Sequence, residues 1–241
     1  KLNQYEKLNP DLRTDRILTT MQKDLRLTQL PKHIECFDNS NIQGTNPVAA
    51  CVVFRDAKPA KKEYRNFNIK TVVGPDDFSS MKEVVGRRYR RLLNESKSLP
   101  DLIIVDGGKG QLSSAVETLK ELEIYDKVAI IGIAKRLEEI YYPDDPIPLY
   151  IDKKSETLKI IQKLRDEAHR FGITHHRNRR SKRNTGSVLE NIEGIGKGTS
   201  VKLLQQFKSV KKVKEADLKA LSASIGPAKA KIVYNHFHAK A

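Results

Sequence analysis

The sequence predicts an α/β fold in which a mixed sheet is flanked by helices, followed by a small all-α domain. Three observations support this prediction. Short apolar runs rich in β-branched residues alternate with helical patterns over residues 1–183. Two of these runs end in an aspartate, Asp38 and Asp106, each followed by polar or glycine residues. Residues 188–241 instead contain two similar helical segments that open on glycine.

The first third of the chain predicts a lead helix and a three-stranded meander. A helix is expected over about residues 12–30, where basic and apolar positions alternate before Pro31. Three strand patterns follow, with only short turns between them. Because short turns join antiparallel neighbours, these strands are expected to form a meander. The strands are Ile34–Asp38, Pro47–Phe54 and Glu63–Ile69.

The middle of the chain predicts alternating helices and strands. A break at Gly74–Asp77 precedes a helix over about residues 80–96, which Asp77 or Ser79 can cap. The remaining elements are a strand Leu102–Asp106, a helix Gln111–Leu122, a strand Val128–Ile133, a hairpin Glu139–Ile151 and a helix Ser155–His169. This order, β-β-β-α-β-α-β and a last helix, matches the ribonuclease-H-like layout.

The two aspartates that end strands predict a metal site. In a ribonuclease-H-like sheet the first and fourth strands are neighbours, so Asp38 and Asp106 are expected at the same edge. Two carboxylates close together are costly unless they share a cation. Oxygen ligands favour a hard divalent ion, Mg²⁺ or Mn²⁺. The alternative is that Asp106 only caps the helix after Gly107–Gly110.

The last core helix offers a third element of this site. Asp166 and His169 are three residues apart and therefore lie on one flank of the helix. This helix is expected to cover the two strand-end aspartates. The alternative is that both side chains belong to a solvated flank.

The net charge of +15, from 45 Lys and Arg against 30 Asp and Glu, predicts a polyanionic partner. Aromatic residues make up only 6% of the chain, which favours contacts with the nucleic-acid backbone over base stacking. Arg87, Arg88 and Arg177 are candidates for tracking DNA, or form a solvated face. Lys109 is a candidate for steadying a phosphate, or packs the glycine turn.

Nothing in the sequence predicts export or membrane insertion. No apolar run approaches transmembrane length and no signal peptide is recognisable. The two cysteines, Cys36 and Cys51, are too few for a disulfide framework. We therefore expect a cytoplasmic protein without a membrane partner. The first residue is Lys1, which predicts a fragment or a processed product.

Residues 188–241 predict two helix-hairpin-helix motifs after a linker at 184–187. Gly194 and Gly196 precede one helix, and Gly226 precedes another. Backbone N–H groups at a helix start bind anions, and Lys197 and Lys229 add charge. Ala223 stands where a leading glycine is expected, which predicts strain and a weaker phosphate grip in the second hairpin. A plain αα-hairpin is the alternative.

Taken together, these motifs resemble the C-terminal half of the UvrC family, the nuclease subunit of bacterial UvrABC nucleotide excision repair. The resemblance spans nearly the whole chain. It is carried by Glu35–Ser40, Pro75–Met81, Pro100–Leu112, Arg165–Phe171, His176–Arg177 and the terminal hairpins. The family implies a ribonuclease-H-like endonuclease, followed by tandem helix-hairpin-helix motifs, that makes the incision on the 5′ side of a damaged base.

The resemblance also implies which residues act. The family's catalytic positions fall on Asp38, Asp77, Asp106 and His169, and Asp166 is a possible substitute carboxylate. Asp38, Asp106 and His169 are the expected metal ligands. Damaged duplex DNA is the expected substrate. UvrB is the partner of the full-length protein, and its docking segment is expected to be missing here. The rival hypotheses are a catalytically silent DNA-binding module and a resolvase or ribonuclease H.

Overall fold

The structure is a computed structural model that describes residues 10–40, 48–72, 76–134 and 139–238, without the side chains of residues 10, 40 and 175–187. The chain divides into two compact units, Lys1–His175 and His176–Ala241. The predicted turn at 41–46 lies outside the described residues. Each unit is described by itself below.

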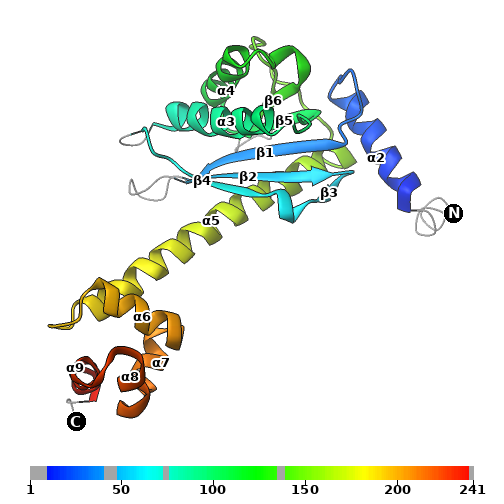
Figure 1. Cartoon of the computed structure of the whole chain (residues 1–241). Helices are drawn as coiled ribbons and strands as arrows, with labels where there is room; N and C mark the ends of the chain where they lie inside the picture. The colour runs from blue at the N-terminus through cyan, green and yellow to red at the C-terminus, as the bar shows by residue number, and fades with distance from the viewer. Residues whose placement is uncertain (1–9, 41–47, 73–75, 135–138, 239–241) are drawn as a thin grey trace. The chain divides into compact units, whose positions relative to one another are not determined.

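The first unit is built on a seven-stranded mixed sheet in the order β3-β2-β1-β5-β6-β7, with β4 paired to β2 (Figure 1). The three central strands, β1, β5 and β6, run parallel to one another. The meander is confirmed, since β2 is antiparallel to both β1 and β4. The strands are β1 (His33–Ser40), β2 (Val48–Arg55), β3 (Lys58–Pro59), β4 (Arg65–Asn68), β5 (Leu102–Asp106), β6 (Ala129–Ile133) and β7 (Ile140–Tyr141).

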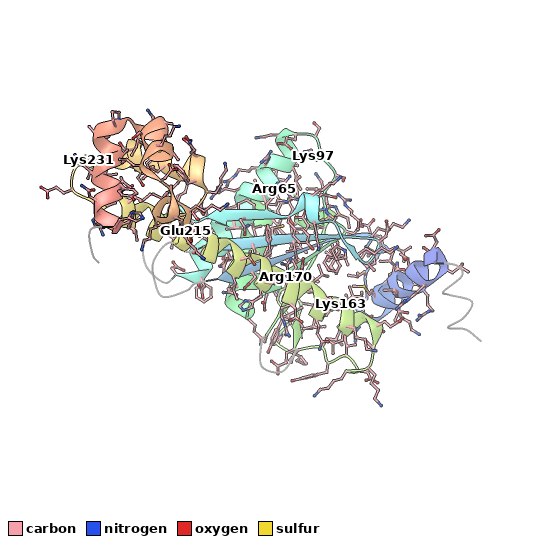
Figure 2. The ribbon with its side chains drawn as sticks, turned by 90° about the horizontal axis from the view of Figure 1, so that it is seen from below. Arg65, Lys97, Lys163, Arg170, Glu215 and Lys231 are labelled. Carbon is pink, nitrogen blue, oxygen red and sulfur yellow. The ribbon has the colours of Figure 1, made fainter. Side chains whose placement is uncertain are left out.

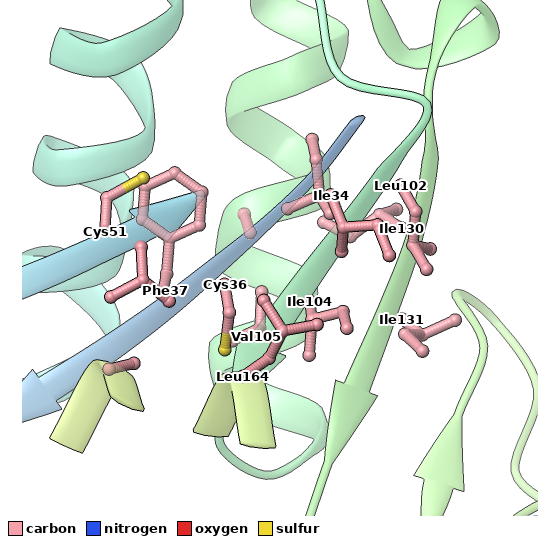
Figure 3. Close-up of a cluster of buried hydrophobic side chains, with 14 of the residues drawn as sticks. Ile34, Cys36, Phe37, Cys51, Leu102, Ile104, Val105, Ile130, Ile131 and Leu164 are labelled. Atoms are coloured by element: carbon pink, nitrogen blue, oxygen red, sulfur yellow. The ribbon is translucent and has the colours of Figure 1, made fainter. Parts of the chain in front are cut away.

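Helices cover both faces of this sheet. Helices α3 (Asp77–Asn94) and α4 (Lys109–Glu121) lie on one face, and the first part of α5 (Glu156–Glu190) lies on the other (Figure 1). Leu164 of α5 packs near Cys36 and Ile104 of the sheet (Figure 3). Lys163 and Arg170, on the other side of α5, are exposed (Figure 2). The apolar stripe of α5 therefore faces the sheet while its basic residues face solvent.

Several element ends differ from the sequence prediction. The lead helix α2 spans Pro10–Asp24 and ends early, because Arg26 takes a left-handed backbone with φ 49°. Asp76 caps α3 by accepting hydrogen bonds from the amides of Phe78 and Ser79, so neither Asp77 nor Ser79 is the cap. Residues 184–187 continue α5 as helix instead of forming an irregular linker.

Alternation along β1 sends its side chains to two chemically different faces. Glu35 bonds to α3 residues and Phe37 packs edge-on against Tyr89 of α3, at 6.0 Å between ring centroids. Successive side chains of a strand point to opposite faces, so Ile34, Cys36 and Asp38 point towards α5. The strand therefore carries one acidic group on each face of the sheet.

Glu35 is fully buried and is neutralised by the α3 residue Arg88. The Arg88 guanidinium donates to both carboxylate oxygens, and the Tyr89 hydroxyl adds a bond of 3.1 Å. His33 Nε2 lies 3.2 Å from the same carboxylate. The prediction that Arg88 tracks DNA is therefore wrong, because its side chain is buried in this ion pair.

The hydrogen bonds around Glu35 keep it ionised. Burial by itself would raise the pKa of Glu35, but the bonds and charges of His33 and Arg88 outweigh burial and lower the pKa to about 2. The folded-state pKa therefore lies below the ordinary value of 4.5. This pair contributes stability above the ordinary pKa, and that contribution is lost as the pH falls towards 2.

The second unit is a set of short helices around its own apolar core. Helices α6 (Lys197–Phe207) and α9 (Pro227–His238) follow the two glycine turns, with α7 (Val210–Glu215) and α8 (Leu218–Ile225) between them. The buried core comprises Leu189, Ile192, Ile195, Leu203, Val213, Leu221, Ala230 and Val233. Among the described residues, no helix has the length and apolar character needed to cross a membrane.

We expect Arg88→Met to lower the free energy of unfolding by about 3–5 kcal/mol, because it leaves the Glu35 carboxylate buried without its cation. Thermal or urea unfolding measures the loss. Arg91→Met is the matched control, since Arg91 forms an exposed pair with Glu95 on the same helix, and its loss should cost much less stability. Equal stability of the Arg88 and Arg91 variants would contradict this account of the core.

Candidate active site

Two buried carboxylates occupy equivalent positions on neighbouring parallel strands. The register of β1 and β5 pairs Ile34 with Leu102 at one end and Asp38 with Asp106 at the other. Only 1% of Asp38 and 3% of Asp106 is exposed. Because paired residues of parallel strands point to the same face, both carboxylates lie on the side of the sheet that α5 covers. The predicted meeting of Asp38 and Asp106 is confirmed.

The charges of both aspartates act on the thiol of Cys36, which points to the same face. Burial raises the pKa of Cys36 well above its usual range, and the negative charges of Asp106 and Asp38 raise it further. Arg165 of α5 acts in the opposite direction. The thiol therefore stays protonated, and two carboxylates and a guanidinium surround this part of the sheet face.

His169 of α5 completes the contact with Asp38. The apolar residues Ile161, Leu164 and Ala168 of α5 are buried against the sheet and fix the position of the helix. His169 follows this stripe, and its Nδ1 lies 3.2 Å from Asp38 Oδ2. The side chain of His169 is 54% exposed, so the ring touches a buried carboxylate on one side and solvent on the other.

The start of α3 is attached to the strand end that carries Asp38. Asn39 follows Asp38 in β1, and its side-chain amide donates to the backbone carbonyl of Asp77 at 2.9 Å. Asp77 is the first residue of α3 and is partly buried. This bond attaches the backbone of Asp77, the third predicted acidic residue, to the residue that follows Asp38. Asn39 was missed as a positioning residue, although an amide directly after a strand-end aspartate was a usable signal.

The glycine turn after Asp106 is attached to the sheet, because the Gly107 amide donates to the Ile133 carbonyl at 3.1 Å. The N-cap residue of α4 is Gly108 and not Asp106. Asp166, the possible substitute ligand, is 76% exposed and pairs with Arg165 at 3.8 Å. The structure therefore brings His169, and not Asp166, to the aspartates.

The basic residues that the sequence predicts to contact DNA lie in different surroundings. Lys109 Nζ donates to the Pro146 carbonyl at 2.8 Å and lies 4.9 Å from the ring centroid of Tyr141, so it ties the glycine turn to the loop after β7. Arg87 bonds to Glu83 and to the Asn68 carbonyl, and it lies over the Phe67 ring. The side chain of Arg177 lies outside the described part of the structure.

The donor set suits a hard cation that also binds a substrate. Within the described residues, no three or more His, Cys, Asp and Glu side chains are grouped so as to hold a metal ion by themselves. Mg²⁺ commonly binds through one or two carboxylates and fills its other positions with water and substrate phosphates. Two buried carboxylates beside a half-exposed histidine fit that pattern.

In the second unit, the glycines with a left-handed backbone are not all those that the sequence predicts. The left-handed backbone occurs at Gly194, with φ 85°, and at Gly226, with φ 82°. Gly196 is the N-cap of α6 with φ −85°, a conformation open to other residues. Ala223 lies inside α8, so the predicted strain at that residue is wrong.

The lysines of the hairpins are placed at or near helix starts. Lys197 is the first residue of α6 and is exposed. Lys229 is in the first turn of α9, and its Nζ lies 3.2 Å from Thr199 Oγ1 of α6, which links the two hairpins. Each turn therefore combines a glycine, a helix N-terminus and a lysine.

A protein-family model, the UvrC RNAse H endonuclease domain, matches residues 22–173, which include both aspartates and His169. The chain belongs to the UvrC RNase H endonuclease domain family. The matched span ends before the hairpins, so family membership by this model concerns the first unit.

Curated relatives agree with this assignment over the whole chain. The UvrABC system protein C of Christiangramia forsetii is 64% identical over 240 residues, and that of Porphyromonas gingivalis is 60% identical over 240 residues. In both cases the match covers 100% of this chain and 40% of the relative. The chain therefore spans less than half the length of these curated relatives.

Among solved structures, similar chains include nucleases. Ciona intestinalis endonuclease V, in complex with DNA, has a TM-score of 0.34 and 18% identity, covering 69% of each chain. XPF from Aeropyrum pernix has a TM-score of 0.24 and 17% identity, covering 66% of this chain and 74% of that chain. The family assignment rests on the sequence matches and not on these scores.

Proposed function

We propose that this chain is a divalent-metal-dependent DNA endonuclease that makes the 5′-side incision in bacterial nucleotide excision repair. The observation that carries the proposal is the register pairing of Asp38 with Asp106, together with the bond from His169 to Asp38. The family match supports a nuclease, and the names of the relatives support excision repair.

Asp38 and Asp106 would hold Mg²⁺ or Mn²⁺. When bound, such an ion polarises a scissile phosphate and lowers the pKa of a water molecule. The chain itself supplies three further parts. The carboxylates are fixed by the sheet, the β1–α3 junction is fixed by the bond from Asn39, and the helix α5 holds His169 at the edge of the pair.

His169 is suited to hold and move a proton. In the tautomer with its proton on Nδ1, the ring donates to Asp38 Oδ2, and Nε2 is an acceptor on the other side of the ring. Nε2 would take a proton from the attacking water or return it to the leaving oxygen. The bond to Asp38 orients the ring for this role, much as a carboxylate orients histidine in other hydrolases.

DNA would be held mainly through its phosphates. The net charge of +15 and the lysines at the two hairpin turns support this binding mode. Backbone amides at the starts of α6 and α9 would bind phosphate without distinguishing bases. Lys109 and Arg87 of the first unit, and Arg177, are the further candidates for phosphate contacts.

A catalytically silent DNA-binding module is the rival function. It would use Asp38 and Asp106 as structural caps, yet the N-cap residue of α4 is Gly108. Burying two carboxylates on one face of a sheet is costly unless they share a cation. The nuclease proposal supplies the reason for the pair. A resolvase or ribonuclease H would use the same chemistry, and the family match favours excision repair over both.

We expect the complete protein to work with UvrB, because the curated relatives are named as component C of the UvrABC system. We also place it in the bacterial cytoplasm. Cys36 and Cys51 are both buried free thiols, which suits a reducing compartment.

Asp38→Asn and Asp106→Asn should each abolish nicking of DNA while preserving the fold, because each removes a charge needed for the cation and changes almost no volume. The measurement is a plasmid-nicking assay with Mn²⁺ and with EDTA. It would be made on the 241-residue chain and, if that chain is inert, on the full-length protein. Melting temperatures serve as the control. Nicking at the wild-type rate by either variant would contradict the metal-site proposal.

His169→Ala should slow incision by about 100-fold or more if the ring transfers a proton, because it removes the acceptor beside Asp38. His169→Gln keeps a hydrogen bond to Asp38 without general-base capacity and should be nearly as slow. Asp166→Ala is the control on the same helix flank and should incise normally. An unchanged pH–rate profile in His169→Gln would argue against proton transfer by this residue.

The hairpins should bind duplexes of different sequence with similar affinity, which falls with salt at a log–log slope of about −0.9 per phosphate neutralised. Gly194→Val and Gly226→Val should each weaken binding, because valine is strained at their left-handed φ values. Anisotropy titrations of the 241-residue chain against several duplexes measure this.

Gly196→Ala separates two causes of lost DNA binding. A Cβ at Gly196 meets no atom within 4 Å and needs no strained angle, so this variant should fold normally. Weakened DNA binding in Gly196→Ala would then report close approach of the backbone to a phosphate. An affinity that is indifferent to salt, or a strong preference for one sequence, would show that the second unit does not bind through phosphates.

A further inference from the structure

One large aromatic side chain at the start of α3 has no role in the proposed reaction. Phe78, the second residue of α3, is 56% exposed, although most apolar residues of this helix are buried. An exposed phenylalanine keeps apolar surface in water, where a polar residue would serve a helix start better. A ligand that covers the ring would remove this apolar surface from water.

The position of Phe78 is fixed by the two chain segments that carry the aspartates. Its neighbour Asp77 is bonded through the backbone carbonyl to Asn39, the residue after Asp38. Its own amide is bonded to the cap residue Asp76 at 3.0 Å. On the other side the ring lies against Gly110, four residues after Asp106, in the first turn of α4. Phe78 therefore bridges the segments that follow both aspartates.

The Phe78 ring packs against Gly110, where only glycine leaves room for it. A Cβ added to Gly110 would lie 2.4 Å from Phe78 Cε1 and 2.8 Å from Cζ, closer than real Cβ contacts allow. Any larger residue at 110 would push the ring away. By contrast, a Cβ added to Gly108 in the same turn would meet nothing within 4 Å, so the close fit is specific to residue 110.

We propose that Phe78 is a substrate-contacting residue that stacks on a nucleobase next to the scissile phosphate. This inference rests on the proposed nuclease function. A ring held between the segments that follow Asp38 and Asp106 lies at the same end of strands β1 and β5 as the two aspartates. DNA bound there would present a base or its sugar next to the phosphate. Every base offers a π-face, so such a contact needs no particular sequence. It also adds one base contact to a protein whose composition favours backbone binding.

The ring has a second consequence for the substrate. A base can stack on an exposed side chain only when it is free of its own neighbours, as in an unwound or distorted segment. The proposed contact therefore favours DNA that is locally opened over a perfect duplex. Preference for opened DNA would then come from stacking near the cut and not from reading a base edge.

The test uses 2-aminopurine, a fluorescent base that is quenched by stacking. It is placed in turn at each position around the observed nick in a bubble substrate, and binding is measured with the 241-residue chain carrying Asp38→Asn, which prevents cleavage. We expect a change in fluorescence at one or two adjacent positions. Phe78→Ala should remove this change and weaken bubble binding by about 5- to 100-fold, while Phe78→Tyr should keep both.

Gly110→Ala provides the positioning test. It should displace the ring and reduce the 2-aminopurine signal, and the double variant with Phe78→Ala should bind no worse than Phe78→Ala alone. Leu93→Ala, an exposed apolar residue on the same helix, is the matched control and should behave as the parent. Additive losses in the double variant would overturn the positioning role of Gly110.

The outcomes separate this proposal from the proposed function. A parent chain that nicks DNA, but whose Phe78→Ala variant gives the same 2-aminopurine signal and affinity, overturns the stacking proposal and leaves the nuclease intact. The proposal is also overturned if Phe78→Ala binds DNA normally and loses incision only when a protein partner is present. Phe78 would then contact that protein.

Discussion

The site depends on the parallel register between β1 and β5. That register places Asp38 opposite Asp106, and it is fixed by the apolar residues that precede them on both strands. A shift of one residue would move Asp106 to the other face of the sheet and separate the carboxylates. Burial of Ile34, Ile104 and their neighbours is thus what holds the two charges together, although none of these residues has chemistry of its own.

The period of two along β1 explains why one short strand carries two acidic groups with different roles. Glu35 points towards α3, where the permanent cation Arg88 neutralises it. Asp38 points towards α5, where its neighbour His169 is charged only when protonated. A permanent ion pair makes Glu35 a structural residue. The His169 side chain beside Asp38 is instead half exposed to solvent.

Much of the fold could be predicted because it follows from local patterns. The strand around Ile104 is a continuous apolar run, and the meander follows from the short turns between strands. The burial of Arg88 could not be predicted from a local pattern, because a run of arginines on a helix predicts a charged surface. Only the tertiary contact with Glu35 decides which of them is buried. The cap at Asp76 was missed because three neighbouring residues could each cap α3.

Helix ends were the least predictable part, and they matter most at the site. Both α3 and α4 start at the edge of the sheet where the aspartates lie, since Asn39 holds the start of α3 and α4 begins three residues after Asp106. A helix N-terminus carries a partial positive charge that favours nearby anions. The βαβ topology therefore brings two such ends to two carboxylates, and the same ends would favour the phosphate of the proposed DNA substrate. Strand register supplies the acidic pair, and helix placement reduces the repulsion between its two carboxylates.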